Sequence, residues 1–350
     1  MKIAIANNLY YPFNRGGAEA VVKTMVTDLK SDGHEVFLIT TKPKKSSDTV
    51  NQDLKIYQLP SDYYNLAGMP LIKKIAWHFN NLFSYRNTNK ITKILAQEKP
   101  DLIMTHNLMG LGFRLPIAIR KLKIKHEHYL HDIQLLHPSG LIMLGDENII
   151  NSRASKFYQY FTRHFFASPD KIISPSQWLL DQHLKKSFFK NSETEIKNVF
   201  SKINTKEVEK IKNNRSNFLF IGQIEYHKGI TLLIEAFKKA LLEKPELKLT
   251  IVGNGLLLEV LIKDNQAEQR IKFLGRIEGE ELKEIMREND CLVVSSLCYE
   301  NAPTTIFEAH ANNLNVLAAD IGGIPEIINS NDELFKPGDI DDLKNKILNK

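Results

Sequence analysis

Short apolar stretches of strand length alternate with amphipathic stretches of helical length along the whole chain. Lys2–Ala6 is an apolar run, and Gly17–Lys30 follows it with apolar residues at helical spacing. Gly33 ends that helix, and Glu35–Thr40 predicts the next strand. Strands that are separated by helices form parallel sheets covered by helices on both faces. The alternation therefore predicts an α/β fold built from βαβ units.

The alternation occurs in two series, which predicts two domains. The further elements of the first series are the helix Asn87–Gln97, the strand Pro100–Thr105 and two weaker strands, His126–His131 and Lys171–Ser174. The second series contains strands at Phe218–Gly222, Lys248–Gly253, Ile271–Leu274, Cys291–Ser296 and Asn315–Ala319, with helices at Ile230–Leu242, Leu256–Gln266, Gly279–Glu288 and 303–313. A polar stretch at 197–216, rich in Lys and Asn, separates the series. We therefore expect two Rossmann-like domains, 1–200 and 201–350, that face each other across a cleft.

Length and composition fit two globular domains without a membrane span. The 350 residues are too many for one typical domain, and 43% apolar and 25% charged residues are ordinary values. No run reaches the ~18 uninterrupted apolar residues of a membrane-spanning helix. Asn7 and Asn8 interrupt the first apolar run too early for a signal peptide. Cys291 and Cys298 form no zinc or disulfide pattern, so we expect a cytoplasmic protein.

Positive charge is concentrated in the first domain. Residues 1–200 hold 27 Lys and Arg against 17 Asp and Glu, a net +10, whereas residues 201–350 hold 20 against 24, a net −4. This is either an ordinary uneven surface or a basic domain that meets an anionic partner, such as a membrane surface or a lipid-phosphate substrate. The stretch Leu71–Arg86 mixes apolar, aromatic and basic residues at helical spacing. It predicts either a helix packed on the sheet or a surface that docks an acceptor or a membrane.

The block Glu300–Ala309 carries the most chemical information. It follows the buried strand Cys291–Ser296, and Pro303 suits the first turn of a helix. The start of that helix offers N–H groups and a positive dipole end, where a diphosphate can bind. Glu300 lies in the loop before the helix, and Glu308 lies more than one turn inside it. Together these features indicate a site for a phosphorylated sugar.

Position, not spacing, distinguishes these two glutamates. The pairs Glu235/Glu243 and Glu280/Glu288 have the same spacing, in charged stretches that are typical of solvated helix faces. Ligand sites in open α/β sheets lie beyond the carboxyl ends of strands. Segments in that position occur in both domains: Asn8–Gly17, His106, His131–Asp132, Gly222–Gly229, Gly253–Gly255, 300–305 and Gly322–Glu326. We therefore expect the active site in the cleft between the domains.

Several motifs occur together in a recognisable order. Glu300-Asn-Ala-Pro-Thr-Thr-Ile-Phe-Glu308 is followed by Gly322-Gly-Ile-Pro-Glu326 and Phe335-Lys-Pro-Gly-Asp339, and the stretch Phe218–Gly229 precedes all three. The opening contains Gly16-Gly17-Ala18-Glu19, a helix and then Asp32–Val36. In these motifs the chain resembles the retaining GT-B glycosyltransferases of the Glu-x7-Glu type, glycosyltransferase family 4, group 1. The resemblance covers almost the whole chain and is loose between residues 41 and 125.

The resemblance implies a hexosyltransferase-type enzyme that transfers a sugar from a nucleotide-diphosphate sugar and retains the anomeric configuration. The second domain would bind the donor. The first would bind a glycan or lipid-linked acceptor in bacterial cell-surface polysaccharide biosynthesis. The nucleotide sugar is then a substrate, with no cofactor, no metal requirement and no nucleic acid. Such an enzyme would act in the cytoplasm, at the inner face of the plasma membrane, as a peripheral membrane protein.

The resemblance also implies roles for single residues. Catalysis would involve Glu300, which contacts hydroxyls of the transferred sugar, and His131, for which His106, His126 and His128 are alternatives. Glu308 would bind the ribose hydroxyls. Two helical residues at this spacing lie ~12 Å apart along the axis, too far for the ~5–5.5 Å acid/nucleophile pair of a retaining glycosidase. We therefore expect a front-face mechanism, in which the leaving phosphate takes the acceptor proton.

Negative charge develops on the leaving diphosphate, so the donor site needs several convergent donors. Lys228 supplies a mobile cation, and glycines let the backbone come close. The residues expected to bind the donor are Gly16, Gly17, Gln223, Lys228, Asn301, Ala302, Pro303, Thr304, Thr305 and Glu308. Backbone contacts to the nucleotide base are expected near Gly253 and Ile277.

Departures from the family pattern leave alternatives open. Gln223 stands where the family often has an arginine that pairs with the diphosphate, Asn313-Leu-Asn315 replaces a Gly-x-Pro, and the chain ends at Lys350, before the usual C-terminal helix. One alternative is a non-catalytic sugar-nucleotide-binding partner subunit, and another is a related GT-B sugar-nucleotide epimerase. Asp339-Ile-Asp341 looks like a metal site, but a helix N-cap with acidic first-turn residues accounts for it. The lack of Gly-x-Gly-x-x-Gly after the first strand argues against a dehydrogenase.

Overall fold

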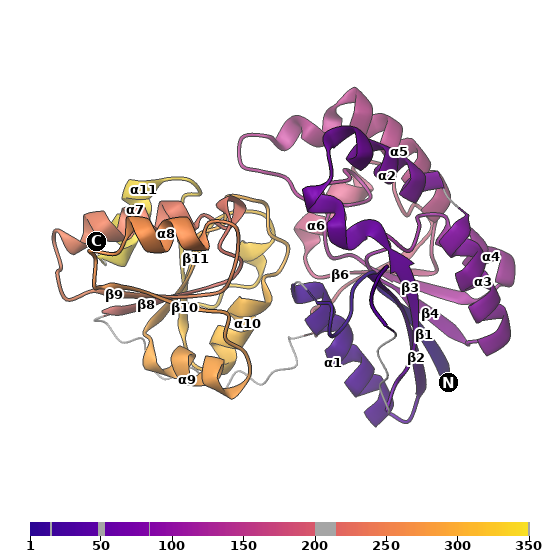
Figure 1. Cartoon of the computed structure of the whole chain (residues 1–350), viewed down its shortest axis with the longest axis horizontal. Helices are drawn as coiled ribbons and strands as arrows, with labels where there is room; N and C mark the ends of the chain where they lie inside the picture. Colours follow the sequence, from indigo (N-terminus) through magenta and orange to yellow (C-terminus); the bar gives the residue numbers. More distant parts are fainter. Residues whose placement is uncertain (15, 48–52, 84, 200–214, 349–350) are drawn as a thin grey trace. The chain divides into compact units, whose positions relative to one another are not determined.

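The chain forms two compact units in the computed structural model, which describes residues 1–14, 16–47, 53–83, 85–199 and 215–348 (Figure 1). The first unit comprises Met1–Leu141 and Asn148–Val199, and the second comprises Ile142–Glu147 and Phe200–Lys350. The predicted boundary stretch at 197–216 lies mostly outside the described residues. The second unit therefore includes a short piece from the first half of the sequence. The predicted division into 1–200 and 201–350 assigned this piece to the first domain.

The first unit contains a parallel sheet that has seven strands among the described residues, in the order β3-β2-β1-β4-β5-β6-β7. The strands are β1 Lys2–Ala6, β2 Glu35–Pro43, β3 Lys55–Ser61, β4 Leu102–Thr105, β5 Lys125–Tyr129, β6 Lys171–Ser174 and β7 Glu193–Ile196. β1 pairs with both β2 and β4, so the strand order reverses there. Ligand sites of doubly wound sheets lie at the carboxyl ends of the strands at this reversal.

Helices cover both faces of this sheet. They are α1 Gly17–Ser31, η1 Asp62–Gly68, α2 Leu71–Phe83, α3 Arg86–Glu98, α4 Leu115–Leu122, η2 Glu147–Asn151, α5 Arg153–Phe166 and α6 Gln177–Leu184. α1 lies on one side of the sheet, and α3 and α4 lie on the other (Figure 1). Val22 and Val26 of α1 pack with Ile3 and Ile5 of β1 in one apolar cluster. The alternation of strand and helix predicted this arrangement.

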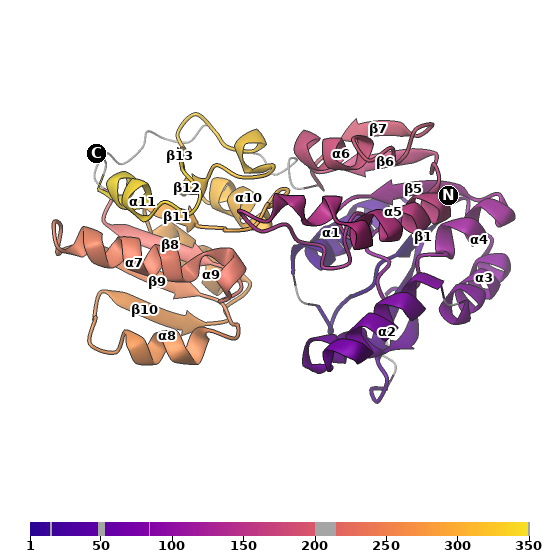
Figure 2. The same ribbon diagram turned by 90° about the horizontal axis from the view of Figure 1, so that it is seen from above.

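The second unit repeats the architecture with six strands in its described part, all parallel, in the order β10-β9-β8-β11-β12-β13 (Figure 2). The strands are β8 Asn217–Ile221, β9 Lys248–Val252, β10 Ile271–Gly275, β11 Cys291–Val294, β12 Asn315–Ala319 and β13 Glu333–Phe335. The helices are η4 Tyr226–Lys228, α7 Ile230–Leu241, α8 Leu258–Asp264, α9 Glu280–Glu288, α10 Thr304–Ala311, η5 Ile324–Glu326 and α11 Ile340–Ile347. The prediction of two α/β domains with parallel sheets is confirmed.

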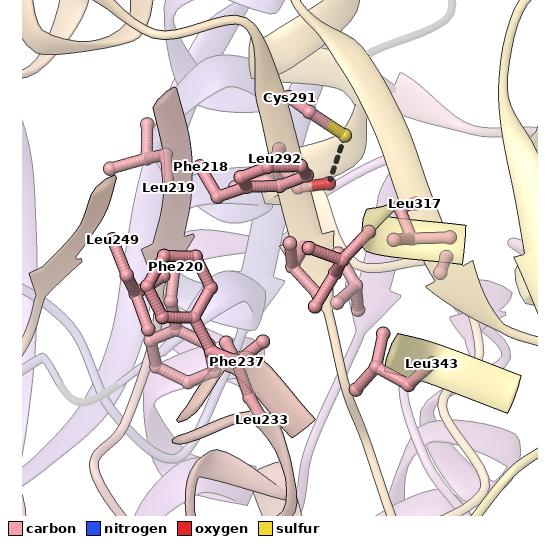
Figure 3. Close-up of a cluster of buried hydrophobic side chains, with 14 of the residues drawn as sticks. Phe218, Leu219, Phe220, Leu233, Phe237, Leu249, Cys291, Leu292, Leu317 and Leu343 are labelled. Carbon is pink, nitrogen blue, oxygen red and sulfur yellow. Dashed lines mark hydrogen bonds between the residues drawn. The ribbon is translucent and has the colours of Figure 1, made fainter. Parts of the chain in front are cut away.

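The core of the second unit explains why its strands are continuous apolar runs. Figure 3 shows side chains of β8, β9, β11 and β12 beside those of α7 and α11. The labelled side chains are Phe218, Leu219, Phe220, Leu233, Phe237, Leu249, Cys291, Leu292, Leu317 and Leu343. Helices on both faces bury all residues of the central strands β11 and β12, and burial of apolar side chains is the main favourable term in folding.

Local structure accounts for two further sequence features. The Asp339 carboxylate caps α11 by accepting hydrogen bonds from the N–H groups of Asp341 and Asp342, at 3.1 and 3.0 Å. Cys291 and Cys298 are both free and buried. Among the helices of the described residues, none has the length and apolar character needed to cross a membrane.

Candidate functional site

Glu300 lies in the loop between β11 and α10, and its carboxylate points at groups of the same unit. Its Oε1 atom accepts hydrogen bonds from the Lys228 ammonium and from the Ser296 hydroxyl, the latter at 2.9 Å. The Cys298 thiol lies 3.8 Å from the same oxygen. The fold therefore brings together the cation and the carboxylate that we single out from the sequence, although 72 positions separate them in the chain.

The Lys228–Glu300 pair stays ionised although it is largely removed from water. The exposed fractions of the two side chains are 26% and 16%. Burial acts to lower the pKa of the Lys228 ammonium, but the adjacent Glu300 carboxylate raises this pKa above its ordinary value. Burial acts to raise the pKa of Glu300, but Lys228 and the Ser296 hydroxyl lower it overall. The site thus holds a fixed cation beside a fixed anion at neutral pH.

Two glycines allow the loops around Glu300 to touch through their backbones. A Cβ at Gly229, where φ is +67°, would lie 1.7 Å from the carbonyl oxygen of Ser295. A Cβ at Gly322, where φ is also +67°, would lie 2.1 Å from the carbonyl oxygen of Glu300. That oxygen accepts a hydrogen bond from the Gly323 N–H at 2.8 Å. Only glycine has both the conformation and the size for these positions.

The helix after Glu300 begins one residue later than predicted and is shorter. α10 spans Thr304–Ala311 instead of 303–313, and Pro303 occupies its N-cap position without a side-chain cap. The first N–H groups of a helix have no carbonyl partner within it and lie at the positive end of its dipole. The residues around this start are all partly exposed: Asn301, Ala302, Pro303, Thr304 and Thr305. The start of α10 is therefore accessible to an anion.

Glu308 has a different environment from Glu300. It lies half-buried on α10, and within the described ranges its carboxylate has no hydrogen bond or ion pair. Burial raises the pKa of Glu308 above the ordinary value. One acid of the pair is thus held by a lysine, and the other is open to a ligand.

The turns after β8 and β9 lie against each other. Gln223 follows β8 and is exposed. A Cβ at Gly253, where φ is +146°, would lie 1.8 Å from the carbonyl oxygen of Gly222. Ile277 is partly buried against the core. The backbone contact alone requires Gly253 to be glycine, so a role near a nucleotide base stays a prediction for Gly253 and Ile277.

In the first unit, Gly16 occupies the N-cap position of α1, which begins at Gly17. Its φ of −162° is ordinary extended backbone, and a Cβ at Gly16 would meet nothing within 4 Å. The Gly16 N–H donates to the Glu19 carboxylate at 2.7 Å, as in a capping box. We predict from the sequence that the backbone N–H groups of Gly16 and Gly17 approach the diphosphate. In this conformation the Gly16 N–H is already hydrogen-bonded to the Glu19 carboxylate.

The four histidines near the carboxyl ends of β4 and β5 differ in burial. His106, His126 and His128 are 1%, 2% and 4% exposed, and the last two hydrogen-bond the Thr105 hydroxyl at 2.7 and 2.8 Å. His131 is partly exposed, and its Nε2 lies 2.7 Å from His106 Nδ1. His126 and His128 therefore serve the core, and of these four His131 is the most open to a substrate.

A small pocket surrounds His131 and Asp132, lined also by His106, Asn107 and Gln134. Burial lowers the pKa of His131 to about 4. Burial raises the pKa of Asp132 to about 6, although the N–H of Gln134 donates to this carboxylate at 2.7 Å. The pocket therefore holds a neutral imidazole at neutral pH.

Sequence reasoning missed the partners that hold Glu300 in place. Ser296 and Cys298 contact its carboxylate, and no spacing rule points to either residue. In the ranges that the structure covers, no cluster of three or more His, Cys, Asp or Glu side chains is arranged to hold a metal ion. The roles expected for the site residues, and their meeting in a cleft, stay predictions.

Comparisons with known proteins agree with the motifs. The family described as "Glycosyltransferase Family 4" matches residues 15–196. The family described as "Glycosyl transferases group 1" matches residues 201–349. A Klebsiella pneumoniae protein described as an "Uncharacterized 42.6 kDa protein in cps region" is 26% identical over 370 residues, which cover 100% of this chain and 96% of the relative. The alpha-monoglucosyldiacylglycerol synthase of Streptococcus pneumoniae is 25% identical over 350 residues, which cover 91% and 71%.

Among solved structures, the Anabaena protein HepE in complex with UDP-glucose has a TM-score of 0.69 to this chain at 18% identity, with coverage of 100% and 89%. At this identity the similarity shows a shared fold. The two family matches confirm the resemblance that we identify from the motifs. Because the family 4 match alone spans more than half of the sequence, the chain belongs to glycosyltransferase family 4, the retaining GT-B glycosyltransferases of group 1.

Proposed function

We propose that this family 4 glycosyltransferase moves a hexose from a nucleotide-diphosphate sugar, with retention, to a glycan or lipid-linked acceptor of a bacterial cell-surface polysaccharide. The observation that carries the proposal is the Lys228–Glu300 pair just before the start of α10. A fixed cation and accessible helix N–H groups suit a diphosphate. A fixed carboxylate suits the hydroxyls of a sugar. These groups meet within one unit, which supports its role as the donor-binding domain.

The chemistry of transfer assigns a task to each of these groups. Breaking the bond to the diphosphate leaves positive charge on the sugar and negative charge on the phosphate. Lys228 and the first N–H groups of α10 stabilise the phosphate charge, with Thr304 and Thr305 beside it. Glu300 holds hydroxyls of the sugar, and Glu308 accepts hydrogen bonds from the ribose. No carboxylate pair is needed as acid and nucleophile, so the leaving phosphate takes the acceptor proton.

The finer identity of the substrates draws support from relatives. HepE was crystallised with UDP-glucose, which supports a UDP-sugar as the donor. The relative in a cps region supports a polysaccharide product, and the relative named for a glycosylated diacylglycerol supports a lipid-linked acceptor. In the first unit, His131 contacts the transferred sugar, and Gly16 and Gly17 approach the diphosphate. The reaction proceeds without a metal ion.

Donor hydrolysis tests the proposal. Nucleotide sugars are screened by thermal shift, because a ligand that binds only the folded protein raises its stability. The stabilising donors are then incubated with the enzyme alone. We expect slow release of free sugar, abolished by Glu300→Gln and unaffected by Glu235→Gln, which alters a glutamate of the same spacing on the exposed side of α7. Tight donor binding without turnover under any acceptor would instead indicate a binding subunit, and an epimerised sugar product would indicate an epimerase.

The partner surface of the first unit is suggested by α2, whose apolar face points outward. Leu71, Ile72, Ile75 and Phe79 are 72%, 82%, 61% and 60% exposed. These positions share one side of a helix. A helix packed on the sheet would bury this side, so that interpretation of the sequence is wrong for the apolar face of α2.

α5 extends the apolar surface of α2. Phe157 and Tyr160 of α5 are 58% and 60% exposed. Ring contacts join the two helices, with centroid distances of 4.6 Å for Phe79–Phe83, 4.8 Å for Phe83–Phe161 and 5.0 Å for Phe157–Phe161. We call this surface the α2/α5 face. It consists of Leu71, Ile72, Ile75, Phe79, Phe157 and Tyr160.

Charge selects the partner of the α2/α5 face. The two helices carry five basic residues and no Asp or Glu: Lys73, Lys74, Arg153, Lys156 and Arg163. Exposed apolar and aromatic side chains among basic residues are the features of helices that lie in the surface of an anionic membrane. The proposed partner is therefore an anionic phospholipid bilayer, at which a lipid-linked acceptor is reached.

Vesicle sedimentation tests the α2/α5 face. We expect salt-sensitive binding to vesicles of phosphatidylglycerol and phosphatidylcholine and little binding to phosphatidylcholine alone. The double substitution Ile72→Gln and Phe79→Gln should weaken binding by at least ~100-fold, because each buried apolar side chain contributes about 1.5–3 kcal/mol. Leu242→Gln, at an 86% exposed leucine of the second unit, is the matched control. Unchanged binding of the double variant would exclude this face, and self-association that the variant abolishes would identify a second copy as the partner.

A further inference from the structure

A segment from the first half of the sequence is built into the second unit beside Glu300. Ile142–Glu147 belongs to this unit and runs antiparallel to the residues just before Glu300. The Leu144 N–H donates to the carbonyl oxygen of Leu297 at 2.8 Å. The Tyr299 N–H donates to the carbonyl oxygen of Ile142 at 2.9 Å. The segment Ile142–Glu147 thus pairs with the residues before Glu300 through an isolated antiparallel bridge.

Apolar contacts hold the same segment. Met143 forms the bridge with Cys298 and packs against the core of the second unit. Leu144 lies against Gly338: a Cβ added at Gly338 would lie 2.9 Å from the Cδ2 atom of Leu144. The segment is therefore part of the packed structure around the loop.

A side-chain hydrogen bond closes the arrangement. The Tyr299 hydroxyl donates to Glu147 Oε1 at 2.9 Å, and the Gly145 N–H donates to the same oxygen at 2.8 Å. These hydrogen bonds, that of Gly145 first, lower the pKa of Glu147. The carboxylate is therefore charged at neutral pH, and hydrogen bonds to a charged acceptor are the stronger ones.

Glu300 is consequently fixed from two sides. Tyr299, its neighbour in sequence, is tied to Ile142 and Glu147, and on the other side the Gly323 N–H holds the Glu300 carbonyl at 2.8 Å. A catalytic group has to be held within ~0.5 Å of its productive position. We infer that Tyr299 and Glu147 are positioning residues, whose hydrogen bond sets the place of the Glu300 carboxylate on the transferred sugar. This inference rests on the function proposed for Glu300.

A positioning role and a merely structural role predict different kinetics. If the hydrogen bond positions Glu300, its loss lowers kcat and leaves the binding of UDP unchanged, because UDP lacks the transferred sugar that Glu300 would contact. If the hydrogen bond only stabilises the unit, its loss lowers the melting temperature and affects UDP and UDP-sugar alike.

The variants are Tyr299→Phe, Glu147→Ala, their double combination and the conservative Glu147→Gln, which keeps an acceptor oxygen. Glu243→Ala, which removes the 2.8 Å ion pair with Lys344 elsewhere in the unit, is the matched control. The measurements are UDP-glucose hydrolysis, UDP binding by calorimetry and amide hydrogen exchange at residues 299 and 323 without ligand.

We expect kcat to fall about tenfold in Tyr299→Phe and in Glu147→Ala, because a misplaced catalytic group costs rate. The double variant should lose no more than either single variant. Glu147→Gln should stay within twofold of wild type, and UDP affinity should not change. Unchanged kcat, or equal losses for UDP and UDP-glucose, would overturn the inference. If the wild-type protein turns over no nucleotide sugar, with or without an acceptor, the proposed function fails instead. Faster exchange at 299 and 323 in Tyr299→Phe would then still support the positioning, and unchanged exchange would refute it.

Discussion

Lys228 is the single residue on which diphosphate binding should depend most. Its ammonium stays charged beside Glu300, and α10 starts four residues after Glu300 in the chain. Lys228→Ala should weaken UDP binding about 10- to 100-fold and leave uridine binding unchanged, because a hydrogen bond to a charged group contributes about 1.5–3 kcal/mol. Calorimetry with both ligands measures the difference. Lys239→Ala, at an exposed lysine 3.2 Å from Asp341, is the control, and equal losses for UDP and uridine would contradict the role of Lys228.

Substitution of Gly16 can distinguish a role of this residue in folding from a role in donor binding. Its backbone is extended, and an added Cβ would meet nothing, so the fold does not require glycine there. If the backbone closely approaches the donor, Gly16→Ala should leave the melting temperature unchanged and lower kcat/KM of donor hydrolysis about tenfold. Gly68→Ala, where a Cβ also meets nothing, should change neither quantity. A Gly16→Ala enzyme with wild-type kcat/KM would remove Gly16 from the site.

At the residue scale, the sequence pointed to Glu300, Glu308 and Lys228 as candidates, but it did not point to Ser296 as a partner of Glu300. In each of the other two glutamate pairs of the same spacing, one member forms an ordinary ion pair with a lysine. Glu243 lies 2.8 Å from Lys344, and Glu280 lies 2.5 Å from Lys283. The position after a strand distinguishes Glu300 from these pairs, and the structure places the predicted Lys228 at its carboxylate. Ser296 could not be predicted as a partner, because its contact depends on how the loop turns back.

At the scale of elements, the contact between the Gly322 turn and the Glu300 loop leaves no room for a larger residue. Gly322→Ala combines a positive φ with a Cβ 2.1 Å from the Glu300 carbonyl oxygen. Gly279→Ala has a similar φ of +73° and nothing within 4 Å. We expect Gly279→Ala to lower the free energy of unfolding by about 1 kcal/mol and Gly322→Ala by more than about 3 kcal/mol, with loss of donor hydrolysis. Urea unfolding measures both free energies. Equal losses in the two variants would show that the Gly322 turn can shift to accommodate a Cβ.

Periodicity predicted elements better than it predicted their surroundings. β1 and β12 have the predicted bounds, because each is a short, mostly buried run that starts at a polar residue and is followed by one, Asn7 or Asp320. α8 spans Leu258–Asp264 instead of Leu256–Gln266, because Asn265 caps its end. The helical spacing of α2 was visible, but its outward-facing apolar side was not, since periodicity fixes a face and not what the face meets.

At the scale of the molecule, the sequence predicted two α/β domains because the strand–helix alternation restarts. It could not predict that Ile142–Glu147 packs with the second unit. A loop carries no periodic signal, and its destination depends on backbone hydrogen bonds that any sequence can form. The same limit applies to Glu147 and Tyr299, whose meeting follows from that destination.

Three histidines, whose pKa values are lowered in the folded state, make the stability of the first unit depend on pH. Burial lowers the pKa of His126 to about 3 and those of His131 and His183 to about 4. Their ordinary pKa is about 6.5 in the unfolded chain, so between pH 6.5 and 4 the unfolded state binds more protons. The free energy of unfolding should therefore be largest above pH 6.5 and fall with decreasing pH, by up to about 1.4 kcal/mol per pH unit for each histidine. Asp132, whose pKa burial raises to about 6, acts in the opposite direction below about pH 6 and offsets one histidine there.

Tryptophan fluorescence isolates this effect, because both tryptophans, Trp77 and Trp178, lie in the first unit. The urea midpoint followed by fluorescence should fall steeply from pH 7 to pH 5. His183→Gln should reduce the pH dependence of the urea midpoint by the contribution of one histidine. His164→Gln, at an exposed position, should leave this dependence unchanged. A midpoint that does not change between pH 7 and pH 5 would mean that these imidazoles are protonated within the folded unit, contrary to the cost of burying their charge.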